Sequence, residues 1–161
     1  MANKPIKRNE NILKLSKEHH FSLLFCWKIK QGLNGEIPSE RIIKYVQYFS
    51  ANFLIPHFRE EELFLFPVLN DEKVDKAIEQ HKQINNIISG ISVHDENNSK
   101  KALQRIAELV DDHVRYEERE LFPYMESKLS DEQLAAIGQK LNEAQALPLK
   151  NEYEDEFWVK K

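Results

Sequence analysis

The stretch HFREEELFLFP at residues 57–67 returns 56 residues later as HVRYEERELFP at residues 113–123. Seven of the eleven positions are identical, and in both copies a Glu follows the His by four residues. On a helix, that spacing puts both side chains on one face, about one turn apart. The repeat therefore predicts two helices that deliver the same pair of side chains, His57 with Glu61 and His113 with Glu117.

The sequence around the repeat favours helices throughout. Four glycines in 161 residues is a low number, and the good helix formers Leu, Glu, Lys and Gln are common. Apolar spacing, loop residues and cap signals predict helices over about 9–31, 40–66, 72–89, 100–128 and 130–146. Four longer helices with short connections are typical of an all-α, antiparallel up-down-up-down four-helix bundle, here followed by a short C-terminal helix and a tail.

Individual residues mark where these helices should begin or bend. Ser39, Asp71 and Ser99 are candidate N-caps, because a side-chain oxygen there can accept from the first free N–H groups. The sequence SDEQ at 130–133 matches a capping box. Pro56 lies inside the second predicted helix, so we expect a kink or a local break just before His57.

Bulk composition limits the class of protein. A chain of 161 residues fits a single domain over 1–161, with a bundle core over about 9–128 and a C-terminal helix and tail over about 130–161. The net charge is −4 and both signs are interspersed, which argues against nucleic-acid binding. The single cysteine, Cys26, and the lack of an apolar leader or membrane-length stretch predict a cytoplasmic protein without a membrane partner.

Each of the four longer helices offers a histidine to the interior. His81 shares its register with the apolar residues Val74, Ile78, Ile84 and Ile88. On the first helix, EHH at 18–20 supplies both His19 and His20, and periodicity alone does not choose between them. Singly, each histidine fits an ordinary core position, but burying four imidazoles and two carboxylates together is costly without compensation. The combination predicts a metal site, whereas His94 lies in a polar loop and is expected to be exposed.

The predicted ligands are nitrogen and oxygen atoms, and the carboxylates can bridge two ions. Such a set favours iron or manganese over a closed structural zinc site, which prefers thiolates and imidazoles. None of the six histidines has a Glu three residues before it, and this disfavours the di-metal bundles that are built on Glu-x-x-His pairs.

The motifs EHH at 18–20, HFREE at 57–61, EQH at 79–81 and HVRYEE at 113–118 resemble the hemerythrin-like, HHE cation-binding family. The resemblance implies a non-haem centre of two oxo- or hydroxo-bridged irons per chain, with manganese or zinc as substitutes. It carries His20 over as the first-helix ligand, because the apolar Leu23 stands three residues later. The implied metal ligands are His20, His57, Glu61, His81, His113 and Glu117, with Glu117 preferred to Glu118 because it matches the Glu61 spacing.

Asn85 marks a departure from the oxygen-carrying members, whose third helix supplies a second histidine four residues after the first. With four histidines, two bridging carboxylates and a bridging oxide or hydroxide, about two of roughly twelve octahedral positions stay open. The resemblance thus implies handling of O₂, NO, peroxide or iron, with a small diatomic ligand or peroxide as partner, in place of bulk oxygen transport. The alternatives are a redox enzyme that consumes peroxide or NO, and an interaction module with a structural metal and the acidic, aromatic tail as its partner surface. The sequence does not decide whether the protein is an enzyme, and it indicates no protein partner.

Other residues near the motifs have two readings each. Tyr116, Tyr45 and Tyr48 could approach such a centre or act as core residues, and the second reading is favoured. Arg59 and Arg115, two residues after their histidines, are expected to face away and form surface ion pairs.

Overall fold

The structure is a computed structural model that describes residues 7–91, 95–144 and 153–159. Within these ranges the chain is helical and contains no strand, which confirms the all-α prediction. The helices are α1 (Leu13–Asn34), α2 (Ser39–Phe49), α3 (Ile55–Glu60), α4 (Glu72–Gly90), α5 (Glu96–Tyr116), α6 (Phe122–Lys128) and α7 (Asp131–Glu143). Among the described helices, none has both the length and the apolar character that crossing a membrane requires.

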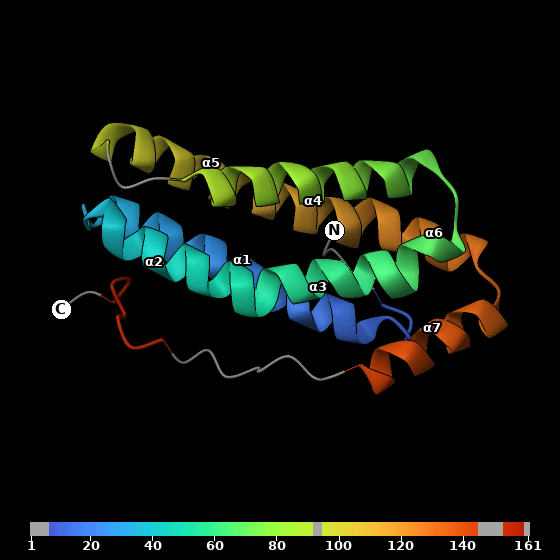
Figure 1. The fold of residues 1–161 in the computed structure, drawn as a ribbon. Helices are drawn as coiled ribbons and strands as arrows, with labels where there is room; N and C mark the ends of the chain where they lie inside the picture. The colour runs from blue at the N-terminus through green and yellow to red at the C-terminus, as the bar shows by residue number, and fades with distance from the viewer. Residues whose placement is uncertain (1–6, 92–94, 145–152, 160–161) are drawn as a thin grey trace, which may run out of the picture.

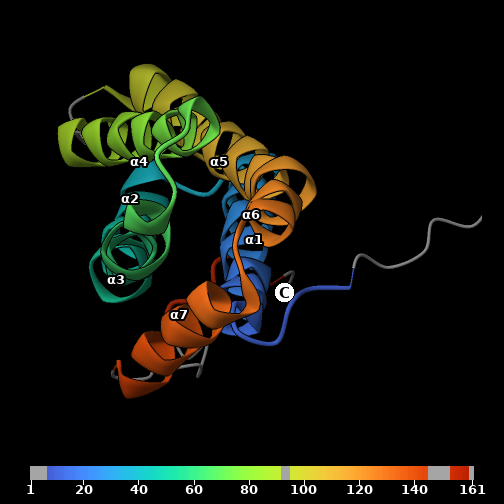
Figure 2. The same cartoon turned by 90° about the vertical axis from the view of Figure 1, so that its right-hand side faces the viewer.

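The helices form a bundle with α7 on its outside (Figure 1). Seen from the end in Figure 2, α1, the α2–α3 rod, α4 and the α5–α6 rod surround a common interior. Helix α1 packs mainly against α5 and also against α2, and α4 packs against α5. Side chains that point inward from these elements therefore meet in one buried space.

Both long rods are interrupted by wider π-helical turns. The α2–α3 rod contains the turns η1 (Ser50–Leu54) and η2 (Glu61–Leu65), and the α5–α6 rod contains η4 (Glu117–Leu121). The first lies directly before Pro56, which stands in the first turn of α3. A proline cannot donate the backbone bond and crowds the carbonyl of the preceding turn, so the widened turn relieves both problems. The irregularity expected before His57 is therefore present as a widened turn, and the rod stays helical through it.

Two of the predicted caps are confirmed. The Asp71 side chain accepts from the Lys73 N–H at 2.8 Å at the start of α4. At the start of α7, Ser130 accepts from the Gln133 N–H, and the Gln133 side chain accepts from the Ser130 N–H, which completes the capping box. Each cap satisfies N–H groups that the helix leaves without an internal partner.

Two other cap predictions are wrong. Asp95, not Ser99, caps α5, because its carboxylate accepts from two backbone N–H groups at the true helix start, one turn earlier. Ser39 is the first residue of α2 and not its cap. Instead, the Glu96 carboxylate accepts both the Ser39 N–H (3.0 Å) and the Ser39 hydroxyl (2.5 Å), and so ties the starts of α2 and α5 together.

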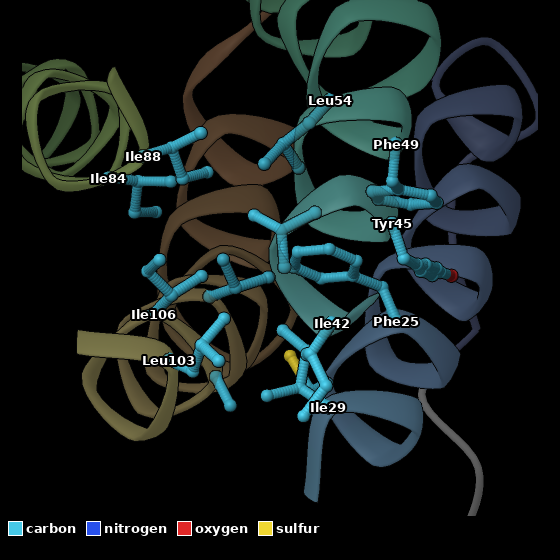
Figure 3. Close-up of a cluster of buried hydrophobic side chains, with 14 of the residues drawn as sticks. Phe25, Ile29, Ile42, Tyr45, Phe49, Leu54, Ile84, Ile88, Leu103 and Ile106 are labelled. Carbon is cyan, nitrogen blue, oxygen red and sulfur yellow. The ribbon is translucent and has the colours of Figure 1, made fainter. Parts of the chain in front are cut away.

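Apolar side chains fill the bundle in two clusters. The larger one, which we name the main apolar cluster, takes residues from α1, the α2–α3 rod, α4, α5 and the tail (Figure 3). Its labelled members in Figure 3 are Phe25, Ile29, Ile42, Tyr45, Phe49, Leu54, Ile84, Ile88, Leu103 and Ile106. A second cluster lies towards α6 and α7 and includes Leu15, Phe66, Phe122 and Leu134. The histidines lie between the two, since His81 stacks on Phe58 of the first cluster (3.9 Å between ring centroids) and on Phe66 of the second (5.7 Å).

The described part of the C-terminal tail, residues 153–159, packs back onto the bundle. Phe157 is buried, its ring lies 5.6 Å from Tyr45, and a Cβ on Gly32 would come within 2.8 Å of it. Arg41 holds Asp155 through two side-chain hydrogen bonds of 2.6 and 2.9 Å. These residues of the acidic, aromatic tail therefore pack over the bundle.

Candidate metal centre

Six buried side chains from the helical rods converge between the two apolar clusters. They form two overlapping groups, and within each group the candidate ligand atoms lie within 4.8 Å of one another. One group is His19, His57, Glu61 and Glu117, and the other is Glu61, His81, His113 and Glu117. Because the two glutamates belong to both groups, the arrangement suits two ions that share a pair of bridging carboxylates.

Glu117 lies between histidines of two different helices. Its Oε1 is 2.8 Å from His113 Nε2 and 3.1 Å from His19 Nε2. His113 stands four residues earlier, in the last turn of α5, so the helix itself places this pair on one face. The π-helical turn η4 begins at Glu117, a feature that recurs at functional positions in helices.

Glu61 occupies the equivalent place in the first copy of the repeat. Its Oε1 is 3.1 Å from His81 Nε2 and 3.4 Å from His57 Nε2, and its Oε2 is 3.8 Å from His19 Nε2. The turn η2 begins at this residue, as η4 begins at Glu117. The repeat seen in the sequence is therefore also a repeat of local backbone structure.

The expectation that His20 points into the bundle is wrong. His19 is 2% exposed and lies in the cluster, whereas His20 is exposed and packs its ring against Phe21. The choice of His20 rested on the apolar Leu23 three residues later, but Leu23 is itself 37% exposed and does not mark the buried face of α1. Choosing the correct histidine required knowing which face of α1 its neighbours cover.

Carboxylates hold the outer nitrogens of His19 and His57. His19 Nδ1 lies 2.9 Å from Glu118, which also accepts the Ser16 hydroxyl at 2.8 Å. His57 Nδ1 lies 2.8 Å from Glu18, a carboxylate that is itself buried. An Nδ1–H that donates outward leaves Nε2 with its lone pair aimed at the centre, which is the tautomer that a metal ligand needs.

The same pattern holds on the other side of the centre. His81 Nδ1 lies 3.0 Å from Glu62, and His113 Nδ1 lies 2.6 Å from the side-chain oxygen of Gln80. The two Nε2 atoms approach each other to 3.1 Å. All four imidazoles are thus held from behind, and their Nε2 atoms point towards the shared carboxylates Glu61 and Glu117.

Several atoms at the heart of the cluster lack an ordinary partner. Among the described residues, His57 Nε2, both oxygens of Glu61 and Oε2 of Glu117 are buried and make no hydrogen bond. Leaving a buried polar atom unsatisfied costs about 1–3 kcal/mol, and more for a charged group. Four such atoms in one cluster, all of types that bind metals, fit a site that a cation completes.

The charges of the cluster are strongly perturbed by burial and by one another. Burial, and then the neighbouring Glu117 carboxylate, raise the pKa of Glu61 well above its ordinary value. Burial would also raise the pKa of Glu117, but His113 and His19 outweigh it and hold that pKa well below the ordinary value. Burial lowers the pKa of His19, yet hydrogen bonds to Glu117 and Glu118 dominate and raise it to about 9. Without a metal, protons on His19 and Glu61 therefore partly neutralise the negative charge of the buried carboxylates.

The sequence did not predict that Glu18, Glu62, Gln80 and Glu118 hold the outer nitrogens of the four histidines, and Glu118 was weighed only as an alternative to Glu117. A signal was present, because each of them is directly next to a site residue in the sequence. Its meaning depends on the packing, however, since each of the three glutamates holds a histidine of a different helical rod. Gln80 does the same for His113 on α5 from its position on α4.

The remaining neighbours follow the simpler readings. The Tyr116 hydroxyl donates to the backbone carbonyl of Lys73 at 2.6 Å, and Tyr45 lies in the main apolar cluster. Arg115 forms a surface ion pair with Asp111 at 2.7 Å. Asn85 is half-buried, and within the described structure its side-chain oxygen is buried without a hydrogen-bond partner.

The exposure expected for His94 concerns a residue outside the described ranges. Tyr48, on α2, is exposed, and its ring lies 5.1 Å from that of Tyr153 in the tail. Arg59 is exposed on α3, as expected for a residue that faces away from the centre.

Comparison with known families places the chain. A family model described as the hemerythrin HHE cation-binding domain matches residues 12–125, which is most of the chain and includes every residue of the cluster. The chain therefore belongs to the hemerythrin HHE cation-binding family. No curated protein and no solved structure matches it.

Proposed function

We propose that this protein binds two iron ions in the buried cluster, inside a single-domain, antiparallel up-down-up-down four-helix bundle. The observation that carries the proposal is the set of unsatisfied atoms on His57, Glu61 and Glu117. The proposed ligands are His19, His57, Glu61, His81, His113 and Glu117. This set keeps five of the six residues predicted from the sequence and replaces His20 by His19.

Two ions are favoured over one by the way the ligand atoms group. Each of the two overlapping groups contains two imidazoles of its own, and the groups share only the two carboxylates. A carboxylate has two oxygens, so it can contribute one to each ion. Iron and manganese suit such an imidazole and carboxylate set, and both accept more ligands than a structural zinc site provides.

We infer that the centre handles a small oxygen- or nitrogen-containing molecule, or iron itself. When bound, two iron ions supply redox chemistry and open coordination positions for O₂, NO or peroxide. Six protein ligands leave part of two octahedral coordination spheres free. The chain's own contribution is to fix the four imidazoles from behind and to keep the centre buried between two apolar clusters.

Metal analysis of matched variants tests the proposal. We expect two irons per chain after anaerobic loading with Fe²⁺, unchanged in His20→Ala and reduced in His19→Ala. The two histidines are adjacent on α1, so His20→Ala controls for effects on the helix. Circular dichroism should show that both variants stay helical, so that a difference in iron content reports on the site. Less than about one iron per chain in the wild type, or equal loss in both variants, would contradict the proposed centre.

A redox enzyme is the second candidate function, and the open coordination positions favour it. Multiple turnovers of hydrogen peroxide or NO by the iron-loaded protein, lost in His19→Ala and kept in His20→Ala, would support the enzyme. Binding without turnover would leave a sensor, carrier or store. The interaction-module alternative receives less support, because Tyr153, Phe157 and Trp158 of the tail pack against Tyr45 of the same chain.

For the location we propose the cytoplasm. The one thiol of the chain, Cys26, is buried, and burial raises its pKa to about 12. Such a thiol stays protonated and inert, and it is compatible with a reducing compartment.

A further inference from the structure

The repeat of the sequence divides the centre into two related halves. Glu18 on α1 and Gln80 on α4 each directly precede the histidine that their helix contributes. Glu18 accepts from His57 Nδ1 at 2.8 Å, and Gln80 accepts from His113 Nδ1 at 2.6 Å. The two residues therefore do the same structural work, but one is a carboxylate and the other is a neutral amide.

The other two outer partners, Glu62 and Glu118, are both glutamates, so their charge does not differ between the two halves. Glu62 accepts from His81 Nδ1 at 3.0 Å, and Glu118 accepts from His19 Nδ1 at 2.9 Å. Both follow directly after a shared central glutamate, in the two copies of the repeat. Among the four outer partners, the difference in charge is thus confined to Glu18 and Gln80.

We propose that the two metal positions are unequal for this reason. The first position, formed by His19 and His57, takes its metal more tightly, and the second position, formed by His81 and His113, holds the exchangeable metal. This inference rests on the proposed dinuclear centre. A carboxylate behind an imidazole raises its basicity and steadies its orientation, and loss of such a partner typically costs about 10–100-fold in metal affinity.

The charged residues nearest to the two halves also make the first half more attractive to a cation than the second. Lys14 lies 2.8 Å from Glu60 and 4.0 Å from Glu18, so one cation faces two carboxylates. At the equivalent place in the second half, Lys76 lies over the ring of Tyr116 at 4.4 Å, and that half offers no carboxylate at the Glu60 position. The first half is more negative than the second even when Glu60 is protonated.

Burial makes the difference at Glu18 effective. The Glu18 side chain is 3% exposed, whereas that of Glu62 is 41% exposed and open to screening by solvent. Arg8 approaches Glu118 at 3.7 Å but also pairs with Glu126, so it is shared between two carboxylates. The first position is therefore backed by the buried carboxylate of Glu18 and by Glu118, which is 28% exposed, whereas the second is backed by the single, more exposed carboxylate of Glu62.

Stepwise titration with Co²⁺ under anaerobic conditions tests the proposal, with visible absorption and competition by a chelator as readouts. We expect the wild type to bind two Co²⁺ in two steps separated by about 10–100-fold. Gln80→Glu should tighten the second step by about tenfold and narrow the separation, and Glu18→Gln should weaken the first step by about 10–100-fold. The double swap Glu18→Gln with Gln80→Glu keeps the composition of the outer partners and should restore two separated steps.

Single-position variants show which step belongs to which position. His113→Ala should retain one Co²⁺ near the tighter constant of the wild type, and His57→Ala should retain one near the weaker constant. Since removal of a buried histidine can impair folding, the near-isosteric Gln80→Glu carries the decision on its own. Two equal affinities in the wild type, or a separation that Gln80→Glu leaves unchanged, would overturn the inference while the dinuclear centre stands. Fewer than two Co²⁺ per wild-type chain would instead overturn the proposed function, and the inference with it.

Discussion

The main apolar cluster and the histidine–glutamate centre lie next to each other in the same bundle and are equally buried. The apolar cluster is satisfied by its own contacts, as Phe25, Ile42 and Ile106 are fully buried among hydrocarbon neighbours. The centre is not satisfied in this way, because Glu61 and Glu117 keep buried oxygens without hydrogen bonds in the described structure. The comparison indicates that the main apolar cluster, the first layer, stabilises the fold. The histidine–glutamate centre, the second layer, costs stability and keeps its imidazoles and carboxylates in a fixed arrangement.

Metal loading should change the free energy of unfolding most, because the metal would bind the buried atoms of the centre that have no hydrogen bond. Two ions, each at 100 times its dissociation constant, add about 5 kcal/mol to the free energy of unfolding, or about 2.7 kcal/mol per ion. Anaerobic denaturant unfolding with Fe²⁺ and with a chelator measures the difference. Identical unfolding curves would contradict the claim that the centre, unlike the main apolar cluster, needs a cation to satisfy its buried atoms.

Ile106→Ala tests the layer that is already satisfied. Ile106 is fully buried in the main apolar cluster, so its truncation should cost about 2–5 kcal/mol through lost burial and a residual cavity. The number of irons per chain should stay at two under conditions where the variant is folded. Loss of metal binding by a variant that remains folded would show that the two layers are coupled.

Glu61→Met is the matching substitution in the centre. It removes two buried oxygens without hydrogen bonds, so the metal-free protein should gain about 1–3 kcal/mol, the usual cost of such groups. Metal content should fall below two ions per chain, because a shared carboxylate is lost. A loss of metal-free stability as large as that of Ile106→Ala would contradict the contrast between the layers.

Ser130→Ala changes a cap that contacts neither layer. Ser130 accepts from the Gln133 N–H at the start of α7, and loss of a serine cap costs about 1 kcal/mol. Thermal unfolding should show this loss in metal-free and metal-loaded protein alike. An effect that depends on metal would indicate that α7 supports the centre.

Glu96→Gln should give the smallest effect, and one that depends on pH. The hydrogen bonds from Ser39 hold the pKa of Glu96 in the folded protein below its ordinary value of 4.5. Around and below pH 4.5, Glu96 therefore binds protons more readily in the unfolded chain than in the folded protein. The stabilisation by Glu96 is therefore present above pH 4.5 and is lost as the pH falls below it. The difference in unfolding free energy between wild type and Glu96→Gln should shrink from pH 6 to pH 3. A constant difference would show that the charge of Glu96 is not involved.

Local patterns in the sequence predicted much of this arrangement. The spacing of His57 to Glu61 and of His113 to Glu117 is fixed by the pitch of a single helix, so no knowledge of packing was needed. His81 could be placed because its apolar neighbours occupy one face of one helix. The break at Pro56 and the capping box at 130–133 likewise depend only on adjacent residues.

Packing between helices decided the rest. His19 and His20 both have apolar companions on α1, and only the position of α1 against α5 and α2 determines which face is covered. Glu62 looks like an ordinary surface residue in the sequence, and Glu118 was weighed only as an alternative to Glu117, yet each reaches a histidine of another rod.

The sequence by itself determined that four helices carry histidines and that two of them repeat a His–Glu pair, because helical periodicity is a property of neighbouring residues. Only the tertiary structure decided that His19 and not His20 joins the centre. It also decided that Glu18 and Gln80 hold equivalent histidines, and this difference is the basis for the proposed inequality of the two metal positions. Both decisions rest on distances between separate helices, and these are set by how the apolar faces pack together.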